Sequence, residues 1–390
     1  MRPGLTASRP ELVIECSPGE VRAALTEGGV LVELLVVRRT DGPRYGEVHR
    51  GRVSRIEHGM NAAFVEIDSG PAGFLPLSGP ARRLAEGAVV AVSIAAEAAT
   101  GKGPRLAMAD ATKNPAGPNR ETELAAVLRS YDPASLARVV ADGASCSARI
   151  RAAWRALVPD AADRIESHTG DTPAFEAYGI EEQIERALAP VIELASGLRL
   201  HFGALEALAA IDVDAASFAP RQAGRATALA ANLAAAGEIA RQIRLRNLAG
   251  LILVDFLRMK DSTERKRVSE AFAGLSAADP VPLHVHGFTR AGLLELTRER
   301  RRRTLADALL EPAQPRRKSA ETVAREALRR AMRAVRGPSV LVAAGDVVAW
   351  FEGEGRAELA DCQALLHTSL KLRANPDFPR DRFEIIGERP

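Results

Sequence analysis

Two short apolar runs, each followed directly by an aspartate, stand out in the pattern of hydrophobic and polar positions. Residues 208–214 have the sequence LAAIDVD, and residues 250–256 have the sequence GLILVDF. Apolar runs of this length predict strands buried on both faces, in a sheet covered by helices. Because ligand sites of open α/β sheets lie at the carboxyl ends of the strands, we expect Asp212 and Asp255 to form an oxygen-lined site suited to Mg²⁺. The spacing alone equally allows each acid to cap the helix that follows its strand.

Helical and strand patterns alternate on both sides of these runs, which predicts an extended α/β region. A helix between the two acidic strands has Leu229, Leu233, Ala236, Ala240 and Ile243 on one face. The other predicted helices lie near 121–131, 146–157, 180–188 and 262–275, and the strands at 136–140, 197–203, 208–214, 250–256, 282–288 and 292–297.

Residues 44–108 predict a small β-barrel. Turn signals such as Asp68-Ser69-Gly70-Pro71 separate β-rich segments at 47–56, 62–67, 72–77, 88–95 and 104–107. Short strands with a Gly-rich hairpin fit an OB-fold, which binds single strands by stacking bases on exposed aromatic side chains. Phe64, Phe74 and Lys102 are candidates for this contact. The alternative is that the two phenylalanines belong to the barrel core.

Charge is spread unevenly, although the formal net charge is only +3. Residues 298–336 contain 13 basic and 5 acidic side chains, and such a segment attracts polyanions. Within it, a helix over 319–336 places two sets of side chains on different faces: Ala324, Leu328, Ala331 and Val335, and Arg325, Arg329, Arg333 and Arg336. We expect the second set to form an exposed basic face that RNA would contact.

The chain of 390 residues is long enough for about two to four domains. No apolar stretch approaches the roughly 18–20 residues of a membrane span, and no apolar signal region follows Met1. Cys16, Cys146 and Cys362 are far apart and form neither a metal-binding CxxC pair nor an evident disulfide framework. We expect them to be small buried hydrophobic residues of a cytoplasmic protein without a membrane partner.

Several longer segments resemble the catalytic half of the ribonuclease E/G family. Residues 51–56 (GRVSRI), 61–67 (NAAFVEI) and 73–77 (GFLPL) are similar to the OB-type RNA-binding domain of that family. Other family-like motifs are YGIEEQIERAL at 178–188, EIARQIRLR at 238–246, GLILVDF at 250–256 and TRAGLLELTR at 289–298. The resemblance covers nearly the whole chain.

This resemblance implies an α/β multidomain fold. An OB-fold β-barrel (44–108) would be inserted in a discontinuous ribonuclease-H-like subdomain (1–43 and 121–188). A DNase-I-like α/β catalytic domain (189–311) and a small α/β C-terminal domain (316–390) would follow.

The resemblance also implies roles for individual residues. Asp212 and Asp255 match the two aspartates that hold Mg²⁺ in the family, with Mn²⁺ as the alternative ion. The ion activates water for attack on a phosphodiester and leaves 5′-phosphate and 3′-hydroxyl ends. Phe64, Phe74 and Lys102 match RNA-contacting residues, which favours base stacking over a core role for the two aromatics.

Asp214 departs from the family pattern, which has Asn at this place. The extra charge would make Asp214 an additional or supporting catalytic residue beside the metal, but it would also repel the scissile phosphate. Residues 215–218 also depart, and Asn247 and Ala249 stand where the family has Asp and Gly. We interpret these changes as clustered around the active strand, which lowers the expected catalytic efficiency.

Two parts of the family architecture are missing. Residues 311–317 (EPAQPRR) contain no cysteine, so the zinc site that joins two chains in the family cannot form. We therefore expect no structural zinc and no zinc-linked tetramer, while a homodimer through apolar segments 340–342 and 385–386 stays open. Residues 109–120 form a linker too short for the 5′-sensor, so cleavage is expected to be indifferent to a 5′-monophosphate.

Two functions therefore remain. The first is a Mg²⁺-dependent endoribonuclease that cleaves single-stranded RNA in RNA processing or decay, with residues 298–303 following the phosphate backbone. The second is a catalytically weak or inactive RNA-binding homologue. Both aspartates are retained, and this favours the enzyme, because a purely binding protein has no need of paired buried acids. A DNA nuclease would rest on the fold alone, and a fold does not fix the substrate.

Overall fold

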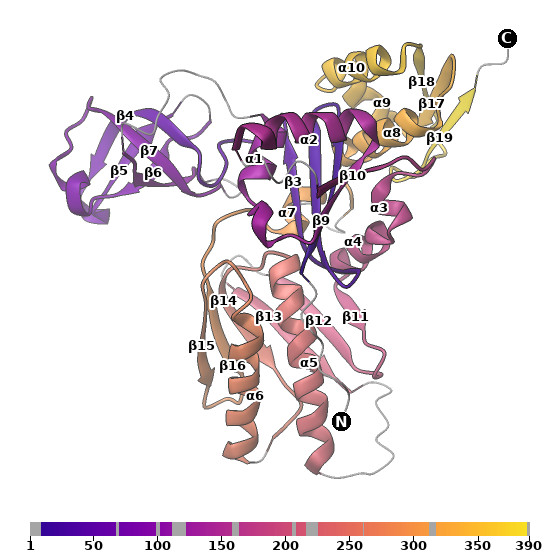
Figure 1. Cartoon of the computed structure of the whole chain (residues 1–390). Helices are drawn as coiled ribbons and strands as arrows, with labels where there is room; N and C mark the ends of the chain where they lie inside the picture. The colour runs from indigo at the N-terminus through magenta and orange to yellow at the C-terminus, as the bar shows by residue number, and fades with distance from the viewer. Residues whose placement is uncertain are drawn as a thin grey trace. The chain divides into compact units, whose positions relative to one another are not determined.

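The computed structural model describes residues 9–67, 70–98, 102–110, 122–157, 164–204, 208–215, 225–259, 261–311 and 317–387 (Figure 1). The chain forms two compact units, each assembled from segments distant in sequence. The first unit comprises residues 1–40, 122–186 and 305–390, and the second comprises residues 41–121 and 187–304. No helix in the described ranges is long and apolar enough to cross a membrane.

The first unit contains a five-stranded sheet of order β10-β9-β1-β2-β3. Strands β1, β2 and β3 are antiparallel to their neighbours in chain order, whereas β9 is parallel to β1 and β10 is parallel to β9. The strands are β1 (Glu11–Ser17), β2 (Glu20–Glu27), β3 (Val30–Arg38), β9 (Arg138–Asp142) and β10 (Ile165–His168). The helices of this part are α1 (Glu123–Arg129), α2 (Gly143–Leu157), α3 (Ala174–Ala177) and α4 (Ile180–Leu188). Residues of α1 and α2, among them Val127, Ile150 and Trp154, share a core with the sheet.

The C-terminal part of the first unit has a three-stranded sheet of order β18-β17-β19 with helices around it. Its elements are α7 (Leu305–Leu309), α8 (Ala320–Ala334), β17 (Ser339–Ala343), α9 (Gly345–Glu352), α10 (Arg356–Leu366), β18 (Leu370–Ala374) and β19 (Phe383–Gly387). Every residue of the central strand β17 is buried, so the prediction that residues 340–342 offer a dimerisation surface is wrong. In β19, Ile386 is exposed.

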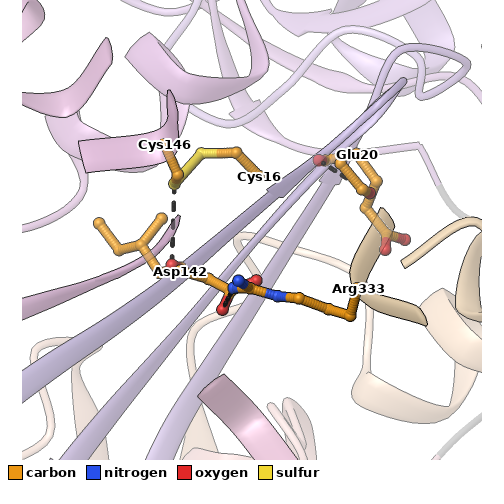
Figure 2. The surroundings of a disulfide bond; sticks show 7 residues. Cys16, Glu20, Asp142, Cys146 and Arg333 are labelled. Atoms are coloured by element: carbon orange, nitrogen blue, oxygen red, sulfur yellow. Dashed lines mark hydrogen bonds and ion pairs between the residues drawn. A yellow bond between two sulfur atoms is a disulfide. The ribbon is translucent and has the colours of Figure 1, made fainter. Parts of the chain in front are cut away.

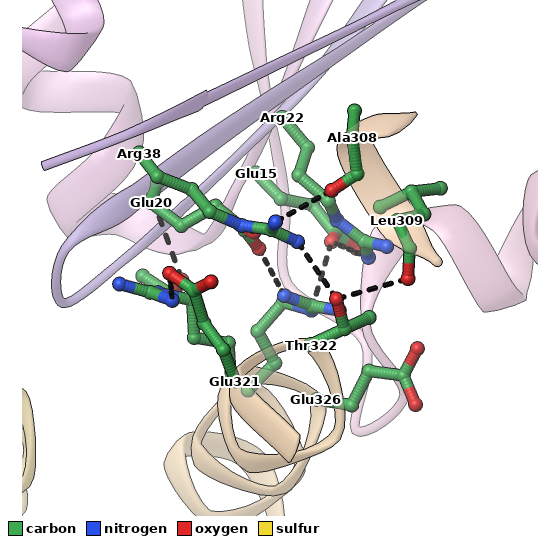
Figure 3. Close-up of polar contacts among 12 residues, drawn as sticks. Glu15, Glu20, Arg22, Arg38, Ala308, Leu309, Glu321, Thr322 and Glu326 are labelled. Atoms are coloured by element: carbon green, nitrogen blue, oxygen red, sulfur yellow. Dashed lines mark hydrogen bonds and ion pairs between the residues drawn. The ribbon is translucent and has the colours of Figure 1, made fainter. Parts of the chain in front are cut away.

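Of the basic face that the sequence predicted for α8, Arg325 and Arg329 are buried, whereas Arg336, just beyond the end of the helix, is exposed. The side chain of Arg325 is fully buried and paired with Glu321 and Glu358, and Arg329 is paired with Glu20 on β2. Arg38 donates to Glu20 at 2.8 Å and to the hydroxyl of Thr322 at 3.2 Å (Figure 3). The prediction failed for these two arginines because carboxylates of β2, of α10 and of α8 itself neutralise them, and unpaired charges could not be buried there.

The prediction that all three cysteines are unpaired buried residues is also wrong for two of them. Cys16 on β1 and Cys146 on α2 form a disulfide with a Cα–Cα distance of 5.5 Å (Figure 2). Asp142, at the end of β9 near this bridge, is ion-paired with Arg333 and accepts from the backbone N–H of Ala174 at 3.1 Å. Cys362 is a free buried cysteine, as predicted, and burial raises the pKa of its thiol to about 12. A sequence separation of 130 residues hid the pairing.

The second unit begins with a closed five-stranded barrel of order β4-β5-β6-β8-β7, which confirms the predicted OB-like barrel. Its strands are β4 (Val48–Glu57), β5 (Ala62–Glu66), β6 (Gly73–Pro76), β7 (Val89–Ala96) and β8 (Arg105–Met108), with short 3-10 helices at His58–Met60 and Gly79–Arg83. Alternate residues such as Val53, Val65, Leu75 and Leu106 fill the interior.

The rest of the second unit is a six-stranded sheet of order β11-β12-β13-β14-β16-β15. Its strands are β11 (Val191–Glu193), β12 (Arg199–Ala204), β13 (Leu208–Asp214), β14 (Gly250–Asp255), β15 (Leu283–Phe288) and β16 (Leu294–Arg298), and its helices are α5 (Arg225–Leu245) and α6 (Ser262–Ser276). The predicted elements are confirmed to within a few residues.

Both long helices lie on one face of this sheet, on the same side in Figure 1. Along β13, Ala209, Ile211 and Val213 are buried, whereas Ala210, Asp212 and Asp214 are exposed. The prediction of strands buried on both faces was therefore wrong. An apolar run can belong to a half-buried strand when its outward positions are small alanines.

Candidate active site

Asp212 and Asp255 lie at paired positions on neighbouring strands. They are register partners in the parallel pairing of β13 with β14, each at or near the carboxyl end of its strand. Adjacent strands are about 4.8 Å apart, and paired side chains project from the same face. Both aspartates are exposed on the face opposite α5 and α6. The structure thus brings the two predicted acids together, but on an open surface and not in the buried setting that the sequence suggested.

The capping alternative for Asp255 is wrong. Helix α6, which follows β14, begins at Ser262, and its N-cap is Asp261, whose side chain accepts from the backbone N–H of Thr263 at 2.8 Å. Asp255 lies six positions earlier and makes no contact of this kind within the described residues. Its carboxylate therefore remains directed to the open face.

Asp214 shares the exposed face with Asp212, two positions away on β13. Its partner in the antiparallel pairing with β12 is Arg199. The guanidinium of Arg199 is ion-paired with Glu193 on β11 at 2.8 Å. The charge that the sequence adds at position 214 thus lies opposite a cation that is ion-paired with another carboxylate. Of the departing residues after Asp214, positions 216–218 lie outside the described residues.

In the antiparallel pairing of β12 with β13, the residue opposite Asp212 is His201, which is half-buried. On the far side of β14, Glu295 of β16 pairs with Leu253, and on β15 the ring of His286 contacts the hydroxyl of Thr297 at 2.8 Å. Acidic groups therefore dominate the middle of the open face, so a phosphate could approach only with cationic or N–H donors beside them.

The two aspartates fit a divalent cation that prefers oxygen. Mg²⁺ is commonly held by one or two carboxylates and keeps several waters and substrate phosphate oxygens as its other ligands. Among the described residues, no group of three or more His, Cys, Asp or Glu side chains converges on one metal position. The paired carboxylates of Asp212 and Asp255 are thus a donor set for an ion that completes its shell with water and substrate.

Phe64 and Phe74 lie side by side on the barrel surface. They are register partners on β5 and β6, their ring centroids are 6.2 Å apart, and both are half-buried. Neither belongs to the hydrophobic cluster that fills the barrel. Arg55 pairs with Phe64 and places its guanidinium 4.7 Å from that ring, while Arg105 pairs with Phe74 on the other side. The two aromatics thus stand in a cross-strand row with a cation at each end.

Lys102 is exposed and close in sequence to this row. The next residue, Gly103, passes so near the barrel that a Cβ there would lie 2.1 Å from the carbonyl oxygen of Ala72. A side chain at 103 would have to displace backbone, so glycine holds the segment against the hairpin that leads into β6. This close approach positions Lys102 next to the strand of Phe74.

Residues 298–303 do not form the free basic track that the sequence predicted. Arg298 is buried and ion-paired with Asp279 at 2.7 Å, and Arg303 is ion-paired with Asp41. Arg301 pairs with Glu299 at 2.8 Å and lies 5.2 Å from the ring centroid of Tyr45. Because Arg298, Arg301 and Arg303 are engaged in intramolecular ion pairs, they do not offer a continuous phosphate-binding surface.

Asn247 and Ala249 are also not at the active end of β14, contrary to the prediction. Asn247 adopts a left-handed conformation with φ of 50° between α5 and β14, before the amino end of the strand. Its amide donates to the carbonyls of Arg302 and Arg303 and accepts from Arg298 at 2.8 Å. About five residues of strand, at roughly 3.3 Å each, separate this end from Asp255. The replacement of the family's Asp by Asn247 therefore affects the packing at the amino end of β14 and not the paired aspartates.

Two residues near the acids were missed at the sequence level. Asn232 of α5 is fully buried and binds both backbone groups of Leu257, just after Asp255. His201 faces Asp212 across a strand pair. Asparagine within an alanine-rich helix gives no periodic signal, and a strand register cannot be read from one sequence.

Comparison with known proteins shows which family the chain is similar to. Residues 108–301 match the model of the Ribonuclease E/G family. Ribonuclease G of Escherichia coli (strain K12) is 26% identical over an alignment of 489 positions, which covers 96% of this chain and 99% of the relative. The alignment is longer than the chain, so the relative contains segments absent here. Ribonuclease E of Nostoc sp. (strain PCC 7120) is 36% identical over 196 residues, covering 49% of this chain and 28% of the relative.

Proposed function

Because the chain belongs to the ribonuclease E/G family, as a short form similar to ribonuclease G, we propose that it is a metal-dependent endoribonuclease that cleaves single-stranded RNA in RNA processing or decay. The layout proposed from the family resemblance is a ribonuclease-H-like sheet around β1, the OB-like barrel, a DNase-I-like sheet around β13 and a small C-terminal domain. The strand orders given above are compatible with it.

The register pairing of Asp212 with Asp255 carries this proposal. Two carboxylates exposed side by side at strand ends have no structural partner among the described residues, and such a pair is suited to hold a divalent ion. Mg²⁺, or Mn²⁺ in its place, would supply Lewis-acid activation of the phosphodiester and of water, giving 5′-phosphate and 3′-hydroxyl products. Asp212 and Asp255 hold the ion, and Asp214 acts as a supporting residue on the same face.

The barrel holds the RNA. Phe64 and Phe74 stack unpaired bases, and Lys102 contacts the backbone, with Arg55 and Arg105 at the ends of the aromatic row. Stacking on aromatic side chains accepts every base and requires unstacked strands, so this surface favours single-stranded substrates without strong sequence preference.

Cleavage of a 5′-labelled, A/U-rich single-stranded RNA tests the proposal. The wild type should cut with Mg²⁺ or Mn²⁺ and not with EDTA, and product ends should carry 5′-phosphate and 3′-hydroxyl. Asp255→Asn and Asp212→Asn should lose cleavage while keeping RNA binding. Glu270→Gln, on the exposed side of α6, is the control and should cut like the wild type. Tight binding without cutting by the wild type, under all metal and pH conditions, would instead identify an RNA-binding homologue.

Substrates with different 5′ ends test the lack of a sensor domain. Most of the linker 109–120 lies outside the described residues, so this claim rests on chain length. One oligonucleotide prepared with a 5′-monophosphate and with a 5′-hydroxyl should be cleaved at similar rates. A strong preference for the monophosphate would contradict the expectation.

A further inference from the structure

His201 occupies the one strand position that faces Asp212 from β12. The antiparallel pairing of β12 with β13 makes these two residues register partners, just as Asp212 and Asp255 are partners across β13 and β14. Directly paired residues have Cβ atoms about 4.5–5.5 Å apart and project from the same face. His201, Asp212 and Asp255 therefore form one row across three adjacent strands.

The carboxylates on this face repel a phosphate electrostatically, and a hydrogen-bond donor such as His201 can offset that repulsion. Asp212, Asp214 and Asp255 are all exposed on the same face, and a phosphodiester is negative. A phosphate bound there needs donors that do not belong to the metal, because two carboxylates neutralise one divalent ion. A neutral imidazole carries one N–H donor. It can therefore donate to a phosphate oxygen without any change in its protonation.

Two other described donors on this sheet are already engaged. Arg199, opposite Asp214, is ion-paired with Glu193 at 2.8 Å. His286 contacts Thr297 and belongs to β15, which is separated from β13 by β16 and β14. His201 has no hydrogen bond to another side chain within the described residues, and it does not join the aspartates in a three-ligand metal group there.

We infer that His201 is a further catalytic residue of this site, whose ring N–H donates a hydrogen bond to a non-bridging oxygen of the scissile phosphate held at Asp212 and Asp255. The inference rests on the proposed nuclease function. A donor placed where charge develops in the transition state acts mainly on the chemical step, and removing one such donor lowers kcat by roughly a hundredfold or more in well-studied enzymes.

The test compares His201→Ala, His201→Gln and the control His284→Ala, which alters an exposed histidine on the edge strand β15. We expect His201→Ala to lower kcat by roughly a hundredfold while RNA affinity in EDTA stays within about twofold. Glutamine keeps an N–H donor, so His201→Gln should recover most of the rate. His284→Ala should match the wild type. Unchanged cleavage by His201→Ala would overturn the inference.

A binding measurement separates this inference from the proposed function. Imidazole ¹⁵N resonances of the full chain are recorded before and after adding a cleavage-resistant 2′-O-methyl RNA with Mg²⁺, and the His201 signal is assigned by its loss in His201→Gln. We expect the His201 signal to shift and the His284 signal to stay. If the wild type does not cut RNA, the nuclease proposal fails, and a shifted His201 signal still supports the contact. An unshifted signal, or equal rate losses for Ala and Gln, would show that His201 has only a structural role.

Discussion

Asp214 and Arg199 face each other across the antiparallel pair of β13 and β12, while the guanidinium of Arg199 is ion-paired with Glu193 at 2.8 Å. Asp214 places its carboxylate on the exposed face that also bears Asp212. We predict that Asp214→Asn lowers the KM for RNA by roughly twofold, since a unit charge about 8 Å from a phosphate in water costs about 0.5 kcal/mol. Steady-state kinetics at low salt measures this change.

Salt dependence provides the control for this prediction. Because the Debye length falls from about 10 Å at 0.1 M salt to about 3 Å at 1 M, the difference between Asp214→Asn and the wild type should shrink as salt is raised. A rise in the Mg²⁺ concentration needed for half-maximal activity would show that Asp214 also supports the metal. A KM that is unchanged or higher in Asp214→Asn at every salt concentration would contradict the repulsion.

Asn232 fixes the backbone that follows Asp255. Its side-chain amide donates to the carbonyl of Leu257 at 2.8 Å and accepts from the N–H of Leu257 at 3.0 Å. We predict that Asn232→Ala destabilises the protein by about 1–3 kcal/mol, because both backbone groups lose their partner in a buried place. Urea unfolding measures the loss. Asn375→Ala, which removes one hydrogen bond in an exposed turn, should lower the free energy of unfolding less. Equal losses for the two variants would argue against a special role for the paired hydrogen bonds of Asn232.

Phe64 and Phe74 are predicted to contribute to RNA affinity through stacking. Base–aromatic stacking is worth roughly 1–3 kcal/mol per base, so each alanine variant should weaken binding of single-stranded RNA by about fivefold or more. Fluorescence anisotropy in EDTA measures affinity without cleavage. Met60→Ala removes a large exposed apolar side chain outside the aromatic row and serves as control. Equal affinities for all three variants would remove the stacking role.

Glu20 is predicted to make the first unit sensitive to acid. Burial alone would raise the pKa of Glu20, but the guanidinium groups of Arg329, Arg38 and Arg22 outweigh burial and hold the pKa at about 2, below the ordinary 4.5. A folded pKa below the unfolded one stabilises the fold above about pH 4.5, and this contribution disappears as the pH falls toward 2. The loss amounts to about 3 kcal/mol.

Urea unfolding between pH 6 and pH 3 measures this dependence. In Glu20→Gln, position 20 no longer titrates, so the free energy of unfolding should fall less steeply with acid than in the wild type. The variant should also be less stable at pH 6, because Arg329 and Arg38 lose a buried partner. Parallel curves for the two proteins would show that other groups control acid unfolding.

The Cys16–Cys146 disulfide predicts one titratable thiol and not three. Protein purified without reductant and denatured in guanidinium should react with a thiol reagent once per chain, at Cys362, and three times after reduction. Because the bridge spans 130 residues, its loss in Cys16→Ser should lower the free energy of unfolding by about 2–4 kcal/mol. Three thiols before reduction would contradict the bridge.

Local sequence determined the elements of this protein and the identity of its acids. The predicted strand 208–214 and helix 180–188 coincide with β13 and α4, because apolar periodicity and turn residues act over neighbouring positions. The barrel strands followed from the same signals. Asp212 and Asp255 were found because each is an acid at the end of an apolar run, and family motifs then indicated their role.

Tertiary structure alone decided which residues meet. The register that pairs Asp212 with Asp255 and with His201, the burial of Arg325 and Arg329 against carboxylates, and the bridge from Cys16 to Cys146 all join positions distant in sequence. A helical face rich in arginine has the same sequence pattern whether it meets water or a buried glutamate. Its environment depends on long-range packing, and that packing leaves no periodic signal in the segment itself.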